Sequence, residues 1–193
     1  MIPFLVGLAG FSGAGKSTLA QHLESQGGVK RFRFDDFYKD EDECPRVENR
    51  PHWDIPESFH LDEAYEALVE LKKGNEIWSP LYSRKESRRV GKTIFTPFPI
   101  IFAEGIMLFS DERIRNLFDL RLWLEVSEEE ALRRRLLRQP GYDTEYHWRV
   151  VVPAARQFIT PYRSSADAII DGSPPFPEVA AAADKILHQF LKI

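Results

Sequence analysis

The segment Gly10-Phe11-Ser12-Gly13-Ala14-Gly15-Lys16-Ser17 is the most informative part of this chain. It has a glycine, four further residues and then Gly-Lys-Ser, directly after the apolar run Phe4 to Ala9. This order predicts a buried strand that leads into a loop and a helix that leaves it. Glycines in such a loop let successive backbone N–H groups turn toward a polyphosphate at the helix N-terminus. The sequence therefore predicts a phosphate-binding loop with a nucleoside triphosphate as its ligand.

The residues of this loop have separate expected roles. We expect Lys16 to reach the β- and γ-phosphates and to take part in catalysis, and we expect the Ser17 hydroxyl to bind Mg²⁺. ATP is the expected phosphate donor, and the sequence leaves GTP open. The residues assigned to nucleotide binding are Gly10, Ser12, Gly13, Ala14, Gly15, Lys16, Ser17 and Thr18.

The composition is typical of one globular domain acting on a small molecule. A chain of 193 residues accommodates one domain, 1–193, with a substantial core. A net charge of −4 argues against a nucleic-acid partner held by a broad basic surface. The single cysteine, Cys44, suits a reducing compartment, so we expect a cytoplasmic protein. No apolar run approaches the roughly 20 residues that cross a bilayer, so no membrane is expected, and a homo-oligomer is left open.

Apolar runs alternate with helical segments along the chain, which predicts a doubly wound α/β domain with a five-stranded parallel sheet. The expected strands are 4–9, 31–34, 99–103, 120–126 and 168–170. The expected helices are 16–24, 58–73, 128–138 and 178–191. Ser127, with Glu130 three residues later, predicts a capping box at the start of the helix 128–138.

Two segments interrupt the alternation of strands and helices. Between 77 and 95, two extended runs flank a charged stretch, which predicts a β-hairpin that covers the substrate. Between 138 and 147, the run Gln139-Pro140-Gly141-Tyr142-Asp143 cannot continue a helix and predicts a mobile lid.

Acidic residues stand just past two of the expected strands, where the open edge of a parallel sheet binds ligands. Asp35 and Asp36 follow the second strand, and Glu104 follows the third. Phosphoryl transfer to a hydroxyl needs a carboxylate that accepts the proton and acidic groups that help to hold Mg²⁺. Asp35 suits the first task and Glu104 the second, although an aspartate pair is also typical of a helix N-cap or a solvated turn.

Four arginines, Arg133, Arg134, Arg135 and Arg138, precede the expected lid. Guanidinium groups brought in by a closing lid stabilise the charge on a transferring phosphoryl group. Arg134 and Arg138 are four residues apart and share a helix face, so we expect this pair to face the site. Arg133 or Arg135 is then solvated.

Several motifs in this order resemble the uridine kinase family, including its nicotinamide riboside kinase branch. The resemblance spans about 4–172 and rests on the phosphate loop, the arginine-rich lid helix and four short motifs. These are Asp35-Asp36-Phe37-Tyr38, Trp53-Asp54-Ile55-Pro56-Glu57-Ser58-Phe59, Glu104-Gly105 and Pro161-Tyr162-Arg163-Ser164-Ser165-Ala166-Asp167-Ala168-Ile169-Ile170.

The resemblance implies roles for individual residues. Asp35 matches the base that acts on the ribose 5′-hydroxyl, and Asp54 matches the aspartate that holds the ribose 2′- and 3′-hydroxyls. It further implies an aromatic lining from Tyr38 and Tyr82, a metal contact from Glu104 and a phosphate contact from Arg138.

The chain departs from the family where pyrimidine kinases read the base. After Pro80-Leu81-Tyr82 those kinases continue with an aspartate, an aromatic residue and then a histidine, whereas this chain has Ser83, Arg84 and Ser87. The lid sequence looks more like the nicotinamide riboside branch, and Pro161 to Ile170 looks more like the uridine branch.

The expected function is an ATP-dependent kinase of a small hydroxyl compound, first of all the 5′-hydroxyl of uridine, cytidine or nicotinamide riboside. A kinase of pantothenate, a sugar or glycerate and a regulatory ATPase are the alternatives. Against the regulatory ATPase, the chain has no Asn-Lys-x-Asp motif, and Glu104-Gly105 stands where a switch protein carries Asp-x-x-Gly.

Overall fold

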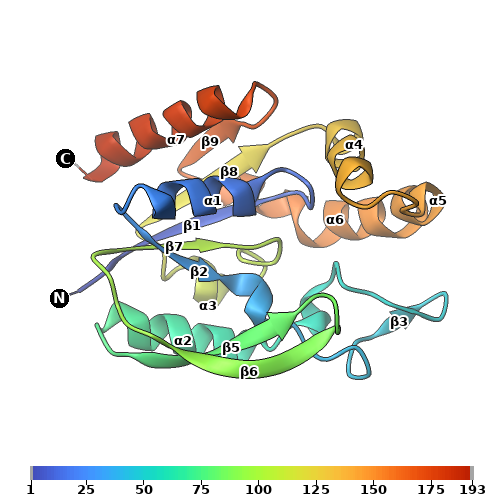
Figure 1. Ribbon diagram of the computed structural model, residues 1–193, viewed down its shortest axis with the longest axis horizontal. Helices are drawn as coiled ribbons and strands as arrows, with labels where there is room; N and C mark the ends of the chain where they lie inside the picture. The colour runs from blue at the N-terminus through green and yellow to red at the C-terminus, as the bar shows by residue number, and fades with distance from the viewer. Residues whose placement is uncertain (1, 192–193) are drawn as a thin grey trace.

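The computed structural model describes residues 2–191, which are organised around one five-stranded parallel sheet (Figure 1). The strand order is β2-β7-β1-β8-β9, and every neighbouring pair is parallel. The strands are β1 (Phe4–Gly10), β2 (Lys30–Arg33), β7 (Ile100–Glu104), β8 (Leu120–Glu125) and β9 (Ala168–Asp171). The predicted α/β fold is confirmed, and each strand ends within one residue of its expected position.

The central strand β1 is buried on both faces, as expected of a parallel sheet covered by helices on both sides. Its Leu5, Val6 and Leu8 side chains have no exposed surface. Helix α1 (Lys16–Ser25) packs beside α7 (Phe176–Leu191), and α2 (Leu61–Lys72) packs beside α3 (Glu112–Arg115). The helix expected over 58–73 starts later than predicted, because a 3₁₀ turn, η2 (Pro56–Ser58), precedes α2.

Helix α4 (Glu128–Arg138) has the predicted bounds and follows β8 at the carboxyl edge of the sheet (Figure 1). The Ser127 hydroxyl accepts a hydrogen bond from the Glu130 N–H at 3.1 Å, so half of the predicted capping box is present. The Glu130 carboxylate does not close the box but pairs with Arg133 and Arg134.

The segment after α4 is more helical than the sequence analysis expected. Helix α5 (Thr144–Tyr146) begins inside the predicted lid. It leads into a π-helical turn, η3 (His147–Val151), then into α6 (Val152–Phe158) and a 3₁₀ segment, η4 (Thr160–Ser165). The Asp143 carboxylate starts this helical stretch by accepting the Tyr146 N–H at 2.9 Å, which is N-capping that the sequence analysis missed.

Two small antiparallel ladders lie outside the main sheet. The predicted hairpin is present as β5 (Ile77–Ser83) and β6 (Arg88–Phe95). A second ladder, β3 (Arg46–Val47) with β4 (Arg50–Pro51), was not predicted. A short 3₁₀ helix, η1 (Phe34–Phe37), follows β2 and carries the Asp35-Asp36 pair.

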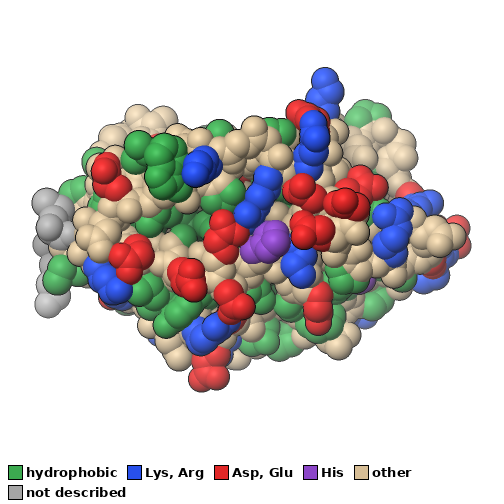
Figure 2. Space-filling model, turned by 90° about the horizontal axis from the view of Figure 1, so that it is seen from below, with side chains coloured by type: hydrophobic (Ala, Val, Ile, Leu, Met, Phe, Trp, Pro, Cys, Tyr) green, Lys and Arg blue, Asp and Glu red, His purple; other side chains and the backbone are tan. Residues whose placement is uncertain are grey.

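Charged side chains of both signs are interspersed over the face of the molecule seen in Figure 2. Within residues 2–191, no helix combines the length and the apolar character that crossing a bilayer requires. The phosphate loop, the Asp35-Asp36 pair and Glu104 lie at the carboxyl edge of the sheet, where β1, β2 and β7 end.

Candidate active site

The phosphate loop joins β1 to α1, and its backbone approaches other parts of the fold very closely. Gly13 has a φ of +94°, in the region that favours glycine. A Cβ atom at this position would lie 2.6 Å from the carbonyl oxygen of Ala131 in α4. Only glycine therefore allows the loop to curve while α4 packs against it.

The variant Gly13→Ala should cost about 2 kcal/mol or more of unfolding free energy, because it combines an unfavourable φ with a backbone clash. Gly27→Ala is the matched control, since Gly27 also has a positive φ, of +79°, but has nothing within 4 Å of the added Cβ. Urea unfolding of both variants separates the two effects. Equal losses in the two would show that the contact with α4 contributes nothing.

Lys16 is the first residue of α1, directly after the loop, and it is buried. Its ammonium donates hydrogen bonds to the carbonyl oxygens of Gly10 and Phe11, each at 2.9 Å. Burial lowers the pKa of Lys16 to about 8, although the Glu104 carboxylate acts in the opposite direction. A buried ammonium held only by carbonyl oxygens is well placed to bind an entering phosphate group.

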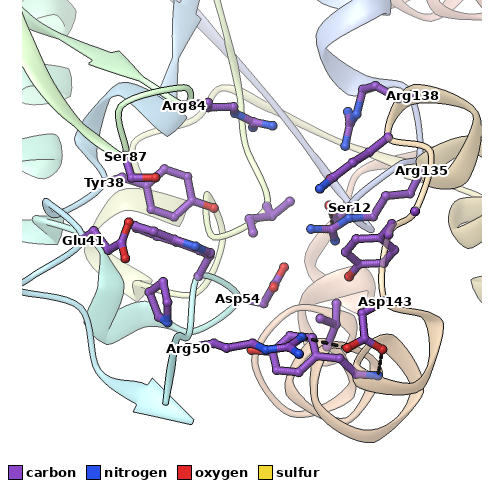
Figure 3. A pocket seen from close by; sticks show the side chains of 18 of the residues that line it. Ser12, Tyr38, Glu41, Arg50, Asp54, Arg84, Ser87, Arg135, Arg138 and Asp143 are labelled. Atoms are coloured by element: carbon purple, nitrogen blue, oxygen red, sulfur yellow. Dashed lines mark hydrogen bonds and ion pairs between the residues drawn. The ribbon is translucent and has the colours of Figure 1, made fainter. Parts of the chain in front are cut away.

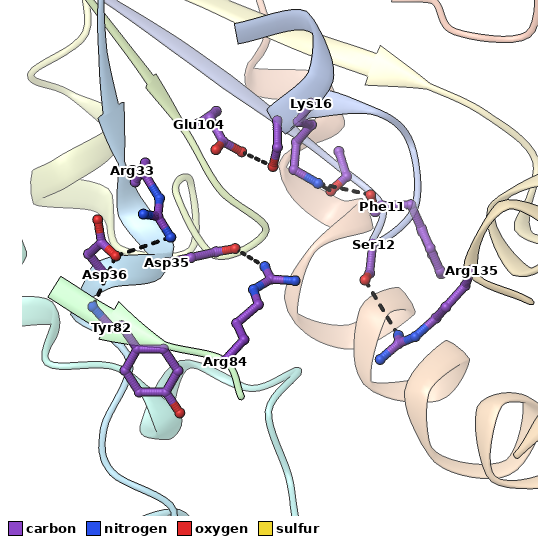
Figure 4. Close-up of polar contacts among 12 residues, drawn as sticks. Phe11, Ser12, Lys16, Arg33, Asp35, Asp36, Tyr82, Arg84, Glu104 and Arg135 are labelled. Atoms are coloured by element: carbon purple, nitrogen blue, oxygen red, sulfur yellow. Dashed lines mark hydrogen bonds and ion pairs between the residues drawn. The ribbon is translucent and has the colours of Figure 1, made fainter. Parts of the chain in front are cut away.

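Ser17 and Glu104 lie together beside Lys16 (Figure 4). Glu104 ends β7, and the Ser17 hydroxyl donates a hydrogen bond to its Oε2 at 3.0 Å. Oε1 of Glu104 pairs with Arg31 at 2.5 Å. Only 1% of Glu104 is exposed, so its carboxylate is buried and is held in place by these two partners. Hydroxyl and carboxylate oxygens suit Mg²⁺, and two protein ligands leave its other positions to phosphate oxygens and water.

A cavity of about 610 Å³ opens next to the loop (Figure 3). Ser12 of the loop lines one side, and the aromatic residues Tyr38, Trp53 and Tyr82 line another. The Tyr38 ring lies 5.6 Å from the Trp53 ring and 5.5 Å from the Tyr82 ring, measured between centroids. The predicted aromatic residues therefore meet in one pocket that is continuous with the phosphate loop.

The Asp54 carboxylate also faces this cavity. The residue is only 6% exposed, and its carboxylate makes no hydrogen bond to any other residue within 2–191. Burial raises the pKa of Asp54, and the nearby Arg135 guanidinium acts in the opposite direction. A buried carboxylate without a partner is suited to bind hydroxyl groups of a ligand.

Asp35 and Asp36 are neighbours with different surroundings (Figure 4). Asp36 supports the fold, because its Oδ1 accepts the Tyr82 N–H at 3.2 Å and lies 3.3 Å from the guanidinium of Arg33. Asp35 Oδ2 pairs with Arg84 of the hairpin turn, while its Oδ1 is buried and has no hydrogen-bond partner among the described residues. Asp35 itself is not among the residues that line the cavity, and it adjoins the cavity through its pair with Arg84, which does line it.

The structure rearranges the predicted set of lid arginines. Arg134 does not line the cavity, because its guanidinium donates to the carbonyl oxygens of Ala14 and Gly172 at 2.9 and 2.7 Å. Arg135 and Arg138 line it instead. Arg135 and Arg138 are three residues apart, a spacing that also places side chains on one helix face. Of the predicted pair, Arg138 lines the cavity and Arg134 contacts the phosphate loop at Ala14.

Arg135 lines the cavity although its position in the sequence did not single it out. Its guanidinium lies 4.2 Å from the centroid of the Tyr142 ring in the predicted lid, and one of its nitrogens lies 3.4 Å from the Ser12 hydroxyl. It therefore connects the lid segment to the phosphate loop. Arg133 is exposed and pairs with Glu130, as expected of a solvated arginine.

The predicted lid contacts the far side of the cavity. Tyr142 and Asp143 line it, and the Asp143 carboxylate accepts a hydrogen bond from Arg50 of β4 at 2.8 Å (Figure 3). Arg149 adds a second link by pairing with Glu48 at 2.7 Å. The lid segment and the β3–β4 ladder therefore meet along one edge of the cavity.

Comparison with known proteins identifies the family of this chain. The model of the phosphoribulokinase / uridine kinase family matches residues 5–175. A uridine kinase of Brevibacillus brevis is 34% identical over 181 residues, which cover 87% of this chain and 84% of the relative. A uridine kinase of Clostridium novyi is 32% identical over 182 residues and 88% of each chain.

Solved structures show the same fold at lower identity. A structure described as a possible uridine kinase from Bacillus stearothermophilus superposes with a TM-score of 0.64 at 20% identity, over 89% of this chain and 90% of that chain. A shikimate kinase from Acinetobacter baumannii gives a TM-score of 0.54 at 18% identity, over 98% and 94%. With the family match over most of its length, this chain belongs to the phosphoribulokinase / uridine kinase family and is a phosphotransferase that acts on a hydroxyl group.

Proposed function

We propose that this chain transfers the γ-phosphate of ATP to the 5′-hydroxyl of a ribonucleoside. The observation that carries the proposal is the single cavity that joins Ser12 of the phosphate loop to Asp54 and the rings of Tyr38 and Trp53. The loop end suits a polyphosphate, and the other end offers flat apolar rings for a base and a buried carboxylate for hydroxyls.

Mg²⁺, bound through Ser17 and Glu104, would offset the charge of the phosphates. Lys16 would contact the same phosphates from the mouth of the loop. Asp35, which adjoins the cavity through its pair with Arg84, would accept the proton of the attacking hydroxyl on its carboxylate. Arg135 and Arg138 would bring positive charge from the lid side and help to exclude water from the cavity.

The proposal is tested by measuring ATP consumption with Mg²⁺ against uridine, cytidine, nicotinamide riboside, 2′-deoxyuridine, pantothenate and simple sugars, with GTP as a second donor. Turnover of a ribonucleoside supports the proposal and identifies the base. Turnover of only pantothenate or a sugar would replace it with another small-molecule kinase. ATP hydrolysis that no hydroxyl compound stimulates would contradict it.

The Asp54 carboxylate should be the main source of selectivity for ribose over 2′-deoxyribose. We expect Asp54→Ala to lower kcat/KM for the ribonucleoside by about 10²-fold or more, because a hydroxyl then loses a charged, buried partner. The same variant should act almost equally on the ribo and 2′-deoxy substrates. Glu57→Ala, an exposed acidic residue of the same segment, is the matched control. Undiminished discrimination in Asp54→Ala would remove Asp54 from the ribose site.

A further inference from the structure

The turn between β5 and β6 brings one basic side chain into the cavity. Arg84 lines the cavity and points toward the phosphate loop in Figure 3. The other arginines of this hairpin have partners elsewhere, since Arg88 pairs with Glu86 at 3.0 Å and Arg89 with Glu63 at 2.7 Å. Arg84 is thus the hairpin arginine placed to meet a substrate.

Contacts at three points hold this turn against the segment that follows β2. The Tyr82 N–H donates to Asp36, the Glu41 N–H donates to the carbonyl oxygen of Ser87 at 2.9 Å, and the Arg89 N–H donates to Asp40 at 2.8 Å. Because these hydrogen bonds flank Arg84 on both sides, its backbone is fixed relative to Asp35. The side chain is therefore organised before any ligand binds.

The guanidinium of Arg84 uses only part of its hydrogen-bonding capacity. Nη2 pairs with Asp35 Oδ2, whereas Nε and Nη1 make no hydrogen bond to any group within 2–191. Figure 4 shows the guanidinium between Asp35 and the loop residues Phe11 and Ser12. A planar group with two donating edges can bind a carboxylate with one edge and a phosphoryl oxygen with the other.

Positive charge is crowded in this region. Burial is the main reason that the pKa of Lys16 is lowered; the Glu104 and Asp35 carboxylates raise it, and Arg84 and Arg138 lower it further. The pKa of Arg138 is also lowered, first by burial and then by Arg84 and Arg135. Cationic side chains that repel one another in the free protein each attract an anion that binds between them, so this arrangement favours binding of a phosphoryl group.

We propose that Arg84 is a catalytic residue that binds the transferring phosphoryl group with one edge of its guanidinium while the other edge holds Asp35. This inference rests on the proposed function. In the step, the substrate hydroxyl oxygen forms a bond to the γ-phosphorus, and the bond from that phosphorus to the bridging oxygen breaks with its electron pair leaving on ADP. The hydroxyl proton passes to the Asp35 carboxylate. Arg84 stabilises the charge that gathers on the phosphoryl oxygens.

The kinetic test compares Arg84→Gln with Arg88→Gln, a matched change at an arginine of the same hairpin that pairs outside the cavity. The Arg84 side chain is 59% exposed, so its removal should leave folding intact, which a thermal melt checks. We expect Arg84→Gln to lower kcat by about 10²-fold or more, with KM for both substrates changed less than about threefold. Arg84→Lys should stay within about tenfold of Arg84→Gln, because an ammonium cannot bind both groups with two edges.

A binding experiment without turnover gives a second readout. The affinity for ADP with Mg²⁺ is measured by calorimetry with and without aluminium fluoride, which mimics the transferring phosphoryl group. We expect the affinity for ADP alone to be the same in all three proteins. Aluminium fluoride should tighten ADP binding in the wild-type protein and in Arg88→Gln by a factor at least tenfold larger than in Arg84→Gln.

Two results would overturn the inference. One is a kcat of Arg84→Gln within about threefold of wild type, or a raised acceptor KM at unchanged kcat, which would assign Arg84 to ground-state binding of the acceptor. The other is an equal response of Arg84→Gln and wild type to aluminium fluoride, whatever its size. The proposed function fails separately, if no ribonucleoside is phosphorylated by the wild-type protein, and the calorimetric comparison then still tests Arg84.

Discussion

Replacing Asp35 by asparagine should lower kcat by about 10³-fold while the affinity for ATP changes little. The amide keeps the shape of the carboxylate but cannot accept the proton of the attacking hydroxyl. Asp35 lies outside the phosphate loop, so the loss should appear in the transfer step and not in the binding of ATP. Steady-state kinetics and ATP titration measure the two quantities separately.

Asp36→Asn is the control for this variant. Asp36 is similarly buried, but its oxygen accepts the Tyr82 N–H, a contact that an asparagine oxygen can keep. Asp36→Asn should therefore retain kcat within about threefold, since no substrate contact is lost. If Asp35→Asn turned over like Asp36→Asn, the proton would have to go to another group and Asp35 would be a structural residue.

Replacing Lys16 by methionine should abolish measurable turnover and at the same time stabilise the free protein. The pKa of this lysine falls from 10.5 to about 8 on folding because the ammonium is buried. Between these pH values the unfolded chain binds more protons, so the contribution of Lys16 to stability rises with pH from 8 to 10.5 and is least favourable below 8. The variant should gain on the order of 1–3 kcal/mol at pH 7, because lost hydrogen bonds offset part of the relieved burial cost.

Urea unfolding of wild type and Lys16→Met at pH 7 and pH 10 measures this effect. The stability difference should shrink at pH 10, where Lys16 is neutral in the folded protein. Lys185→Met, at an exposed position of α7, controls for the added methionine. A variant that was less stable at pH 7, or a stability difference that did not depend on pH, would contradict the view that burying the Lys16 ammonium costs stability.

Short-range features were readily predicted from the sequence. The phosphate loop, the five strands and the hairpin at 77–95 depend on local pattern, such as apolar runs between turn-forming residues. The helix 128–138 was located correctly because Ser127 marks its start and Gln139-Pro140 its end. The β3–β4 ladder was not found, since a strand of two residues has no periodicity to detect.

The choice among the lid arginines could not be made from spacing. Arg134 and Arg135 both share a helix face with Arg138, at four and three residues. Their contacts differ, because Arg134 donates hydrogen bonds to the carbonyl oxygens of Ala14 and Gly172, whereas Arg135 contacts Ser12 and the ring of Tyr142. These partners are distant in the chain and become neighbours only when the sheet and α4 are assembled.

The same distinction applies to the candidate site as a whole. The sequence by itself determined the phosphate loop, the sheet that positions it and the acidic residues at its carboxyl edge, because each depends on nearby residues and on the period of strands and helices. Only the tertiary structure decided that Arg84 meets Asp35 and that Asp36 supports Tyr82. The direction and partners of a side chain depend on how the hairpin docks on the segment after β2, and local sequence does not encode that docking.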